Sequence, residues 1–218
     1  MRAVIVADGC GSLGEVSWQA VRGADLVVAA DGGAESLTSA GFWPNAVIGD
    51  FDSLSPETLD VLRDRGCEII AHPRRKDKTD SELALGWCVE RGARDIAIVG
   101  ATGGERLDHA LANVFLLTAP VLDGIRVRII DERNEVFLLR GVGTIEGEMG
   151  DTVSLIPVTP EVKGISTQGL EYPLRGGSIR MGSTLGISNV LVSERARVSV
   201  SEGSLLVIVH HRRREASR

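Results

Sequence analysis

Aspartates end three apolar runs of the chain, each about as long as a β-strand. Asp8, Asp31 and Asp50 are the last residues of these runs, and a glycine or a second acid follows within two residues. In an open α/β sheet, ligands bind in the crevice beyond the carboxyl ends of the parallel strands. Carboxylates at several such ends converge on one crevice and repel each other unless a cation or a ligand uses them. The pattern therefore predicts a cation-dependent site.

The pair Asp50 and Asp52 is the best candidate for the cation ligands. One residue separates them, so in extended backbone both side chains point to the same side. Mg²⁺ typically accepts one or two carboxylates together with substrate phosphates. The alternative is that these aspartates only cap turns, which is common after strands. Because the pair follows a buried run and two further strand ends carry acids, we favour the metal site.

A mixed-charge segment, Arg75–Glu82, precedes a helical pattern that begins near residue 80. Basic residues beside a helix N-terminus suit phosphate groups, because the exposed N–H groups and the helix dipole add to their attraction. Asp80 either caps this helix or reaches the same metal as Asp50 and Asp52. The sequence leaves both possibilities open.

The segment Gly100–His109 is rich in glycine and lies between a buried run and another helical pattern. Glycines at this junction let backbone N–H groups approach phosphate oxygens, and Arg106 adds a bidentate donor. The segment matches neither the Walker A loop nor the dinucleotide-binding fingerprint, and a glycine turn without a ligand is the alternative. Together, the strand-end clusters suit metal-assisted phosphoryl or pyrophosphoryl transfer.

The elements that must position these residues alternate between strands and helices up to about residue 140. Near-continuous apolar runs are typical of parallel strands buried on both faces, and repeated strand–helix–strand units imply an α/β sheet. The predicted strands are Ala3–Asp8, Leu26–Asp31, Ala46–Asp50, Glu68–His72, Asp95–Ala101 and Arg126–Asp131.

Three helices are predicted between these strands. The first opens with Ser55 as N-cap and Pro56 at the first helical position. The second covers about 80–91, and we expect it to turn Leu83, Trp87 and Val89 inward. The third covers 107–117, where three apolar residues stand at helical spacing: Leu111, Val114 and Phe115.

The pattern changes after residue 140. The glycine-rich segment 141–150 is interpreted as a linker or hairpin, and short alternating runs separated by turn signals follow it. We therefore expect a Rossmann-like parallel-sheet catalytic domain over 1–140, a small all-β sandwich domain over 145–212 and a basic tail over 213–218.

Composition excludes several classes of protein. The net charge of −6 over 218 residues disfavours nucleic acid as the main partner. No apolar stretch reaches the roughly 20 residues that span a bilayer, and an acid interrupts the N-terminus too early for a signal peptide. A cytoplasmic protein that does not bind membranes is expected. Cys10, Cys67 and Cys88 form no C-x-x-C pair and are expected to serve packing.

At these residues the sequence strongly resembles the thiamine pyrophosphokinase (thiamine diphosphokinase) family. No single motif is specific, but the set occurs in the family's order and covers nearly the whole chain. The matching segments are Ala30–Ala34, Pro44–Ser53, Lys76–Glu82, Gly103–Asn113, Lys163–Gly164, Gly169–Leu174 and Gly186–Asn189.

The resemblance implies transfer of a pyrophosphoryl group from ATP to the hydroxyethyl oxygen of thiamine, giving thiamine diphosphate and AMP. It also implies a homodimer that holds thiamine between the catalytic domain of one subunit and the β domain of the other, with Mg²⁺ as cofactor. By motif, Asp50, Asp52 and Asp80 correspond to the Mg²⁺ ligands. The other implied site residues are Asp31 and Asp108 as active-site acids, Lys78, Thr79, Thr102, Gly103, Gly104 and Arg106 for ATP, and Ser188 and Asn189 for thiamine.

The sequence departs from the family's pattern at two places. Animal members carry an aromatic residue after Ser-Asn that stacks on the thiamine pyrimidine, whereas Val190–Val192 follow here. Asp8 stands where members often carry a small polar residue, and we assign it no catalytic role. Two alternative functions are a metal-dependent nucleotide-sugar transferase, which also presents Asp-x-Asp after a strand, and a non-catalytic nucleotide-sensing module.

Overall fold

The computed structural model describes residues 1–9 and 12–212. The predictions for Cys10 and for the basic tail 213–218 lie outside this range. Within it, Cys67 and Cys88 are buried free thiols, as a packing role requires. Burial raises the pKa of Cys67 to about 11 and that of Cys88 to about 12, so both remain protonated at neutral pH.

The chain divides into two compact units, Met1–Glu132 and Arg133–Arg218. The division falls before the predicted boundary at 140, because the strand β7 (Asn134–Leu139) pairs antiparallel with β14 (Leu205–His210). The apolar run of β7 resembles the strands that precede it in sequence, so its hydrophobicity alone does not show to which unit it belongs.

The first unit is an α/β domain, as predicted. Its six strands pair in parallel in the order β6-β5-β1-β2-β3-β4. They are β1 (Arg2–Val6), β2 (Leu26–Ala30), β3 (Ala46–Gly49), β4 (Glu68–Ala71), β5 (Asp95–Val99) and β6 (Arg126–Ile130). The central strands are buried almost throughout, whereas the edge strand β4 is only partly buried. The order reverses between β1 and β5, and ligands bind at such a switch point.

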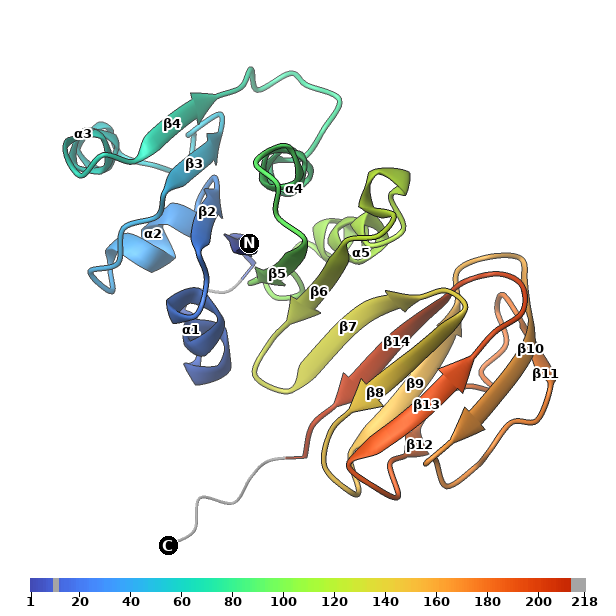
Figure 1. Ribbon diagram of the computed structural model, residues 1–218. Helices are drawn as coiled ribbons and strands as arrows, with labels where there is room; N and C mark the ends of the chain where they lie inside the picture. Colours follow the sequence, from blue (N-terminus) through green and yellow to red (C-terminus); the bar gives the residue numbers. More distant parts are fainter. Residues whose placement is uncertain (10–11, 213–218) are drawn as a thin grey trace, which may run out of the picture. The chain divides into compact units, whose positions relative to one another are not determined.

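Helices cover both faces of this sheet. Figure 1 shows α1 (Glu15–Arg22), α2 (Gly33–Thr38) and α3 (Pro56–Asp64) on one side, and α4 (Asp80–Glu90) and α5 (Leu107–Leu116) on the other. A short 3₁₀ turn, η1 (Pro120–Leu122), follows α5. The N-terminus of α3 is formed as predicted, with the Ser55 hydroxyl accepting from the Thr58 N–H at 3.1 Å and Pro56 next in the chain.

The buried face of α4 differs from the prediction, and in α5 two of the three apolar residues at helical spacing are exposed. In α4 the buried residues are Ser81, Ala84, Leu85 and Cys88, whereas Leu83, Trp87 and Val89 are only partly buried. This helix is apolar around most of its circumference, so its hydrophobic periodicity does not define the buried face. In α5, Leu111 and Phe115 are 50% and 54% exposed and the polar Asn113 is buried.

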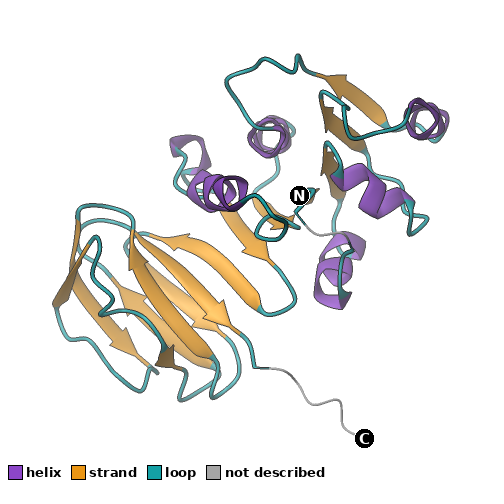
Figure 2. Ribbon diagram, turned by 180° about the vertical axis from the view of Figure 1, so that it is seen from behind, coloured by secondary structure: helices purple, strands orange, loops and turns teal. Residues whose placement is uncertain are grey.

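The second unit is built from strands and loops, and Figure 2 draws no helix in its described part. One sheet contains β12-β9-β14-β7 and the other has the order β11-β10-β13-β8. The strands not yet given are β8 (Val142–Glu146), β9 (Thr152–Pro157), β10 (Glu161–Gln168), β11 (Gly177–Arg180), β12 (Asn189–Val190) and β13 (Arg195–Ser199). Buried side chains from both sheets form one core, which makes this unit a β-sandwich. The segment interpreted as a linker or hairpin contains β8.

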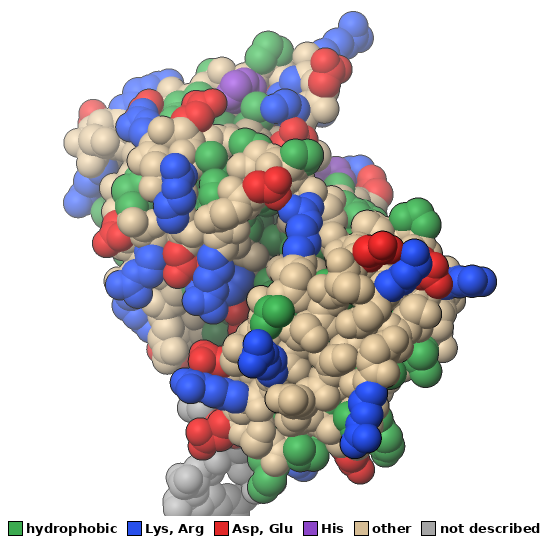
Figure 3. Space-filling view, turned by 45° about the vertical axis from the view of Figure 1, so that its right-hand side comes forward, with side chains coloured by type: hydrophobic (Ala, Val, Ile, Leu, Met, Phe, Trp, Pro, Cys, Tyr) green, Lys and Arg blue, Asp and Glu red, His purple; other side chains and the backbone are tan. Residues whose placement is uncertain are grey.

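The surface carries charges of both signs. Figure 3 shows acidic and basic side chains interspersed over the face that it presents. Among the described residues, no helix is long and apolar enough to cross a membrane.

Candidate active site

The ends of four parallel strands in the first unit surround a pocket of about 470 Å³. Asp8 and Gly9 follow β1, Asp31 follows β2, Asp50 follows β3, and the loop after β5 closes another side. This is the edge of the sheet, at the β1/β5 switch point, where the topology predicts a ligand. Of the residues proposed from the sequence, Asp31, Asp50, Asp52, Thr79, Asp80, Gly103, Gly104 and Arg106 line the pocket.

Asp31, Asp50 and Asp52 form the centre of the acidic group. Each offers one carboxylate oxygen, and these oxygens all lie within 4.8 Å of one another. Backbone and hydroxyl donors fix the carboxylate of Asp31: the Phe51 N–H donates to Oδ1 at 3.1 Å and the Ser53 hydroxyl donates to Oδ2 at 2.8 Å. Hard carboxylate oxygens at this spacing fit a divalent cation such as Mg²⁺ or Mn²⁺.

The backbone around these acids is strained. Asp31 has φ of 44° and Phe51 has φ of 61°, in the left-handed region that residues with a Cβ rarely adopt. Gly49 lets the two strand ends approach, since a Cβ there would lie 3.0 Å from the Asp31 side chain. Strain of this kind persists only where the surrounding structure enforces it, and such positions cluster at functional sites.

Burial and mutual repulsion raise the pKa of two of the acids. Burial, with the negative charges of Asp80, Asp50 and Asp52, raises the pKa of Asp31 against the opposing Ser53 hydrogen bond. Burial and the charge of Asp31 likewise raise the pKa of Asp8. The smaller, electrostatic part of each pKa shift comes from the neighbouring carboxylates, and a cation bound among them would offset their charge.

The segment before α4 surrounds the acids with basic groups. Lys76 Nζ lies 2.9 Å from Asp80 Oδ1 and 3.6 Å from Asp50 Oδ2, and Arg74 pairs with Asp52 at 3.2 Å. Burial lowers the pKa of Lys76, but hydrogen bonding and attraction from Asp80 and Asp50 outweigh it and raise the pKa overall. The ammonium is therefore charged at neutral pH.

The N-terminus of α4 answers a question that the sequence left open. Thr79, not Asp80, caps this helix, because its hydroxyl accepts from the Glu82 N–H at 3.2 Å. Asp80 is the first helical residue and remains on the pocket wall. Lys78 does not line the pocket and instead pairs with Glu82 at 3.4 Å.

The glycine-rich loop after β5 forms another wall. Gly103 and Gly104 line the pocket, and Gly104 adopts φ of 82°, which suits glycine. The buried side chain of Asn113 on α5 donates to the Ala101 carbonyl at 2.9 Å and so ties the loop to the helix. The Thr102 hydroxyl contacts Asp131 at 3.3 Å and does not line the pocket.

Asp108 is placed differently from the other acids. It receives two hydrogen bonds from Arg106, at 2.9 Å and 2.6 Å, and it does not line the pocket. The Arg106 hydrogen bond lowers the pKa of Asp108 well below its usual range. The geometry thus supports Asp108 as the group that orients Arg106, which does line the pocket.

Ser188 and Asn189 belong to the second unit. Ser188 is exposed and has φ of 59°, another strained non-glycine residue. The side chain of Asn189 is engaged with backbone: its amide donates to the Tyr172 carbonyl at 2.7 Å, and its oxygen accepts from the Tyr172 N–H at 3.0 Å. Asn189 therefore shapes the loop that carries the exposed Tyr172.

Some pocket residues were not among the proposed site residues. Asp8 lines the pocket although no role was assigned to it, and its position at a strand end was the available signal. Ser53, His109 and Asn113 also line it, and each stood inside a motif quoted for the family resemblance. Lys76 also stood inside such a motif, although it does not line the pocket, and only the fold shows that its ammonium reaches Asp80 and Asp50.

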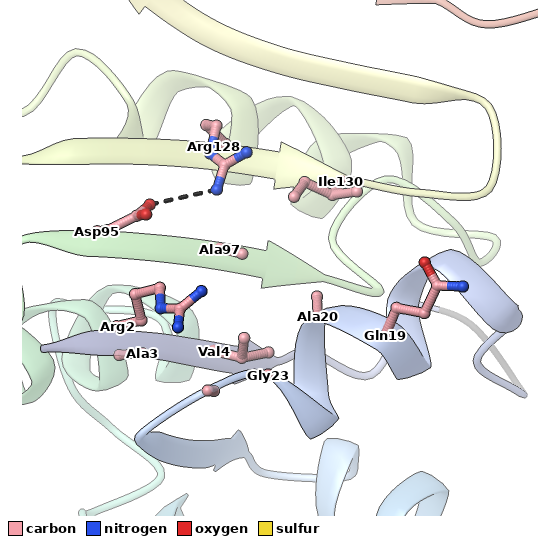
Figure 4. Close-up of a pocket in the computed structure, with 11 residues that line it drawn as sticks. Arg2, Ala3, Val4, Gln19, Ala20, Gly23, Asp95, Ala97, Arg128 and Ile130 are labelled. Carbon is pink, nitrogen blue, oxygen red and sulfur yellow. Dashed lines mark hydrogen bonds and ion pairs between the residues drawn. The ribbon is translucent and has the colours of Figure 1, made fainter.

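A second hollow lies on the sheet face beside α1 and measures about 130 Å³ (Figure 4). Its polar lining includes Arg2 and an ion pair between Arg128 and Asp95 at 3.2 Å. The hollow runs along the sheet from Arg2 and Asp95, which begin β1 and β5, to Ile130 at the end of β6, and it shares no lining residue with the acidic pocket.

A parallel sheet with clustered acids and a glycine turn at its switch point is typical of nucleotide-binding enzymes of the phosphoryl-transfer class. Residues 18–129 match the family model "Thiamin pyrophosphokinase, catalytic domain", and residues 142–205 match "Thiamin pyrophosphokinase, vitamin B1 binding domain". The chain belongs to the thiamine pyrophosphokinase family. The activity that this membership carries is pyrophosphate transfer from ATP to thiamine, and neither alternative function is favoured.

Individual relatives support the same family membership. The chain is 35% identical to the thiamine pyrophosphokinase of Bacillus subtilis over 185 residues, covering 84% of this chain and 86% of that protein. The crystal structure of thiamin pyrophosphokinase from Geobacillus thermodenitrificans is 36% identical, with a TM-score of 0.84 and 99% of each chain covered. That of a thiamin pyrophosphokinase family protein from Enterococcus faecalis is 27% identical, with a TM-score of 0.85 and coverage of 98% and 100%.

Proposed function

We propose that the acidic pocket of the first unit binds ATP with Mg²⁺ and is the place where pyrophosphate is transferred to thiamine. The observation that carries this proposal is the convergence of Asp31, Asp50 and Asp52 within 4.8 Å in a pocket at the switch point. We assign the metal to these three carboxylates, with Asp80 beside them on the pocket wall. When bound, Mg²⁺ neutralises charge on the phosphates and polarises their oxygens.

The reaction requires little covalent chemistry from the protein. The hydroxyethyl oxygen of thiamine bonds to the β-phosphorus of ATP, the bond from that phosphorus to the bridging oxygen of the α-phosphate breaks, and AMP leaves. The hydroxyl proton is released to solvent in the process. The chain's own residues contribute by positioning and by electrostatics, which supply most of the catalysis in this class of reaction.

We assign ATP phosphate binding to the walls next to the acids. The glycine loop with Gly103 and Gly104 brings backbone close to a ligand, and Arg106, oriented by Asp108, supplies a cation. Thr79 lies at the N-terminus of α4, where the helix dipole favours anions. Lys78 and Thr102 are at the periphery, and we expect smaller effects from their substitution.

We assign thiamine binding to the second unit, at Ser188 and Asn189, and propose a homodimer in which the first unit of one subunit and the second unit of its partner form one active site. The resemblance to the family supports this assembly, as does a stripe of exposed apolar residues on α5, namely Leu107, Leu111 and Phe115. Light scattering on the purified protein tests the dimer. A cytoplasmic location is also proposed, since ATP is the donor.

The test of the function is a turnover assay with Mg²⁺, ATP and thiamine that follows AMP and thiamine diphosphate. We expect both products in equal amounts, and we expect Asp52→Asn to reduce the rate by several orders of magnitude with folding intact. Absence of both products across sensible pH and metal conditions contradicts the proposal. Consumption of a sugar nucleotide, or tight ATP binding without turnover, indicates one of the two alternatives instead.

A further inference from the structure

Lys76 shares the acidic site without lining the pocket. Its ammonium contacts Asp80 at 2.9 Å and Asp50 at 3.6 Å. The Lys76 and Asp50 side chains are only 13% and 15% exposed, and that of Asp80 is 23% exposed. Little water therefore screens these charges, unlike those of an ion pair on the open surface.

Asp50 belongs to two groups at once. It faces Lys76 through Oδ2, and it contributes an oxygen to the group with Asp31 and Asp52. A divalent cation held by that group and the ammonium of Lys76 are like charges that use the same carboxylate. Each must weaken the other's attraction to Asp50, and the effect is large where screening is poor.

We infer that Lys76 is a positioning residue that keeps the affinity of the acidic site for free divalent cations low, so that the metal is accepted together with the phosphates of the nucleotide. The inference rests on the proposed function for the identity of the site. A nucleotide triphosphate brings several negative charges, which compensate the lysine as well as the metal. A metal ion alone brings no such compensation and meets the full repulsion of the ammonium.

The charge of Lys76 is the property to test, and Lys76→Met removes it while keeping most of the side-chain volume. The probe is Mn²⁺ alone, titrated without nucleotide and followed by electron paramagnetic resonance. We expect Lys76→Met to bind Mn²⁺ about tenfold more tightly than the unmodified protein, or more. Lys76→Arg keeps the charge and should restore weak binding.

Lys163→Met is the matched control, because it makes the same charge change at an exposed surface pair with Glu202 in the second unit. Its Mn²⁺ affinity should stay within twofold of the unmodified protein. Thermal melting of each variant checks folding, and Lys76→Gln serves as a second neutral variant if Lys76→Met does not fold.

Unchanged or weaker Mn²⁺ binding in folded neutral variants overturns the inference. So does equal tightening by Lys163→Met or by Lys76→Arg. The readout is independent of thiamine turnover: an enzyme that makes no AMP can still show the Mn²⁺ shift, and an active enzyme can lack it. The failure of this inference is therefore distinguishable from a failure of the proposed function.

Discussion

Asp31 combines several features that are typical of a functional site in one residue. It combines a left-handed backbone, a partly buried carboxylate and three neighbouring acids that raise its pKa. Each of these features opposes folding when no cation is bound. Its type and strand-end position could be predicted from the sequence, but its strain and its hydrogen bonds from Phe51 and Ser53 depend on how two strand ends meet.

Replacing Asp31 by Asn should stabilise the metal-free protein while abolishing most of its activity. The raised pKa means that the folded state binds a proton more readily than the unfolded state. Above the folded-state pKa, the ionised carboxylate of Asp31 therefore destabilises the folded protein. The amide removes this cost and can keep the hydrogen bond from the Phe51 N–H. We expect the melting temperature in chelator to rise at pH 7.

The pH dependence gives the control for this prediction. As the pH falls through the raised pKa of Asp31, the unmodified protein gains a proton and recovers the lost stability, whereas the Asn variant does not titrate. The difference in melting temperature should therefore shrink between pH 7 and about pH 4. A variant that is less stable than the unmodified protein at pH 7 contradicts the argument.

Asp50→Asn should affect turnover more strongly than Arg106→Lys. The first change removes a carboxylate that both the proposed metal and Lys76 use, and we expect a loss of at least about a hundredfold in kcat. The second keeps a positive charge but loses the bidentate geometry, and we expect mainly a raised KM for ATP. Steady-state kinetics on both variants measure this split, and equal effects on kcat would argue against the separate roles.

At the scale of elements, the strands were predictable and the helix faces were less so. The parallel strands are short apolar runs, and all of them except β4 are followed within two residues by an acid or a glycine, a pattern that depends on the local chain. The buried face of α4 depends on which neighbour it meets, and its small residues Ala84 and Cys88 pack where larger Leu83 was expected. The strand β8 was not predicted, because its segment is rich in glycine. Its pairing partner β13 is about 50 residues away in sequence, so the local chain does not indicate the pairing.

The connection between α5 and the glycine loop provides an element-scale prediction. Asn113→Leu removes the buried amide that donates to the Ala101 carbonyl and leaves that acceptor unsatisfied, at a cost of about 1–3 kcal/mol in the free energy of unfolding. The loop loses its tie to the helix, so the KM for ATP should rise. Chemical denaturation and ATP-dependent kinetics measure the two effects, and Ala112→Ser on the same helix is the control.

At the scale of the whole molecule, the two units separate the residues predicted to bind metal and ATP from those predicted to bind thiamine. The strand-end acids and the glycine loop belong to the first unit, and Ser188 and Asn189 belong to the second. The order of motifs along the chain was enough to predict this separation. The boundary itself was harder, because β7 matches the preceding strands in composition and only its antiparallel partner β14 identifies its unit.

In the second unit, Asp151 connects the turn before β9 to the residues that follow β14. It is 2% exposed; its carboxylate accepts from the Glu148 and Arg212 N–H groups at 2.9 Å each, and it pairs with His211 Nδ1 at 2.8 Å. Although burial opposes the charge, these backbone hydrogen bonds and His211 lower the pKa of Asp151. Its contribution to stability is thus present above the unfolded-state pKa and is lost as the pH falls through the lower folded-state pKa.

Asp151→Asn should therefore destabilise the protein at pH 7 by about 1–3 kcal/mol, because an amide cannot accept from all of these donors. The difference from the unmodified protein should narrow as the pH falls from about 4, the ordinary pKa of an aspartate, through the lower folded-state pKa of Asp151. Denaturation at several pH values measures this. A constant difference across the range would show that the charge of Asp151 does not matter.

The same anchorage determines where the chain tolerates shortening. Because β14 lies between β7 and β9 and the residues that follow it are held to Asp151 through His211 and Arg212, the described contacts of this segment extend beyond the end of the strand to Arg212. A stop codon placed after Arg212 keeps all of these contacts and should yield folded protein. One placed after Val209 removes the contacts of Asp151 with His211 and Arg212, together with His210 of β14, and should send much of the product into inclusion bodies.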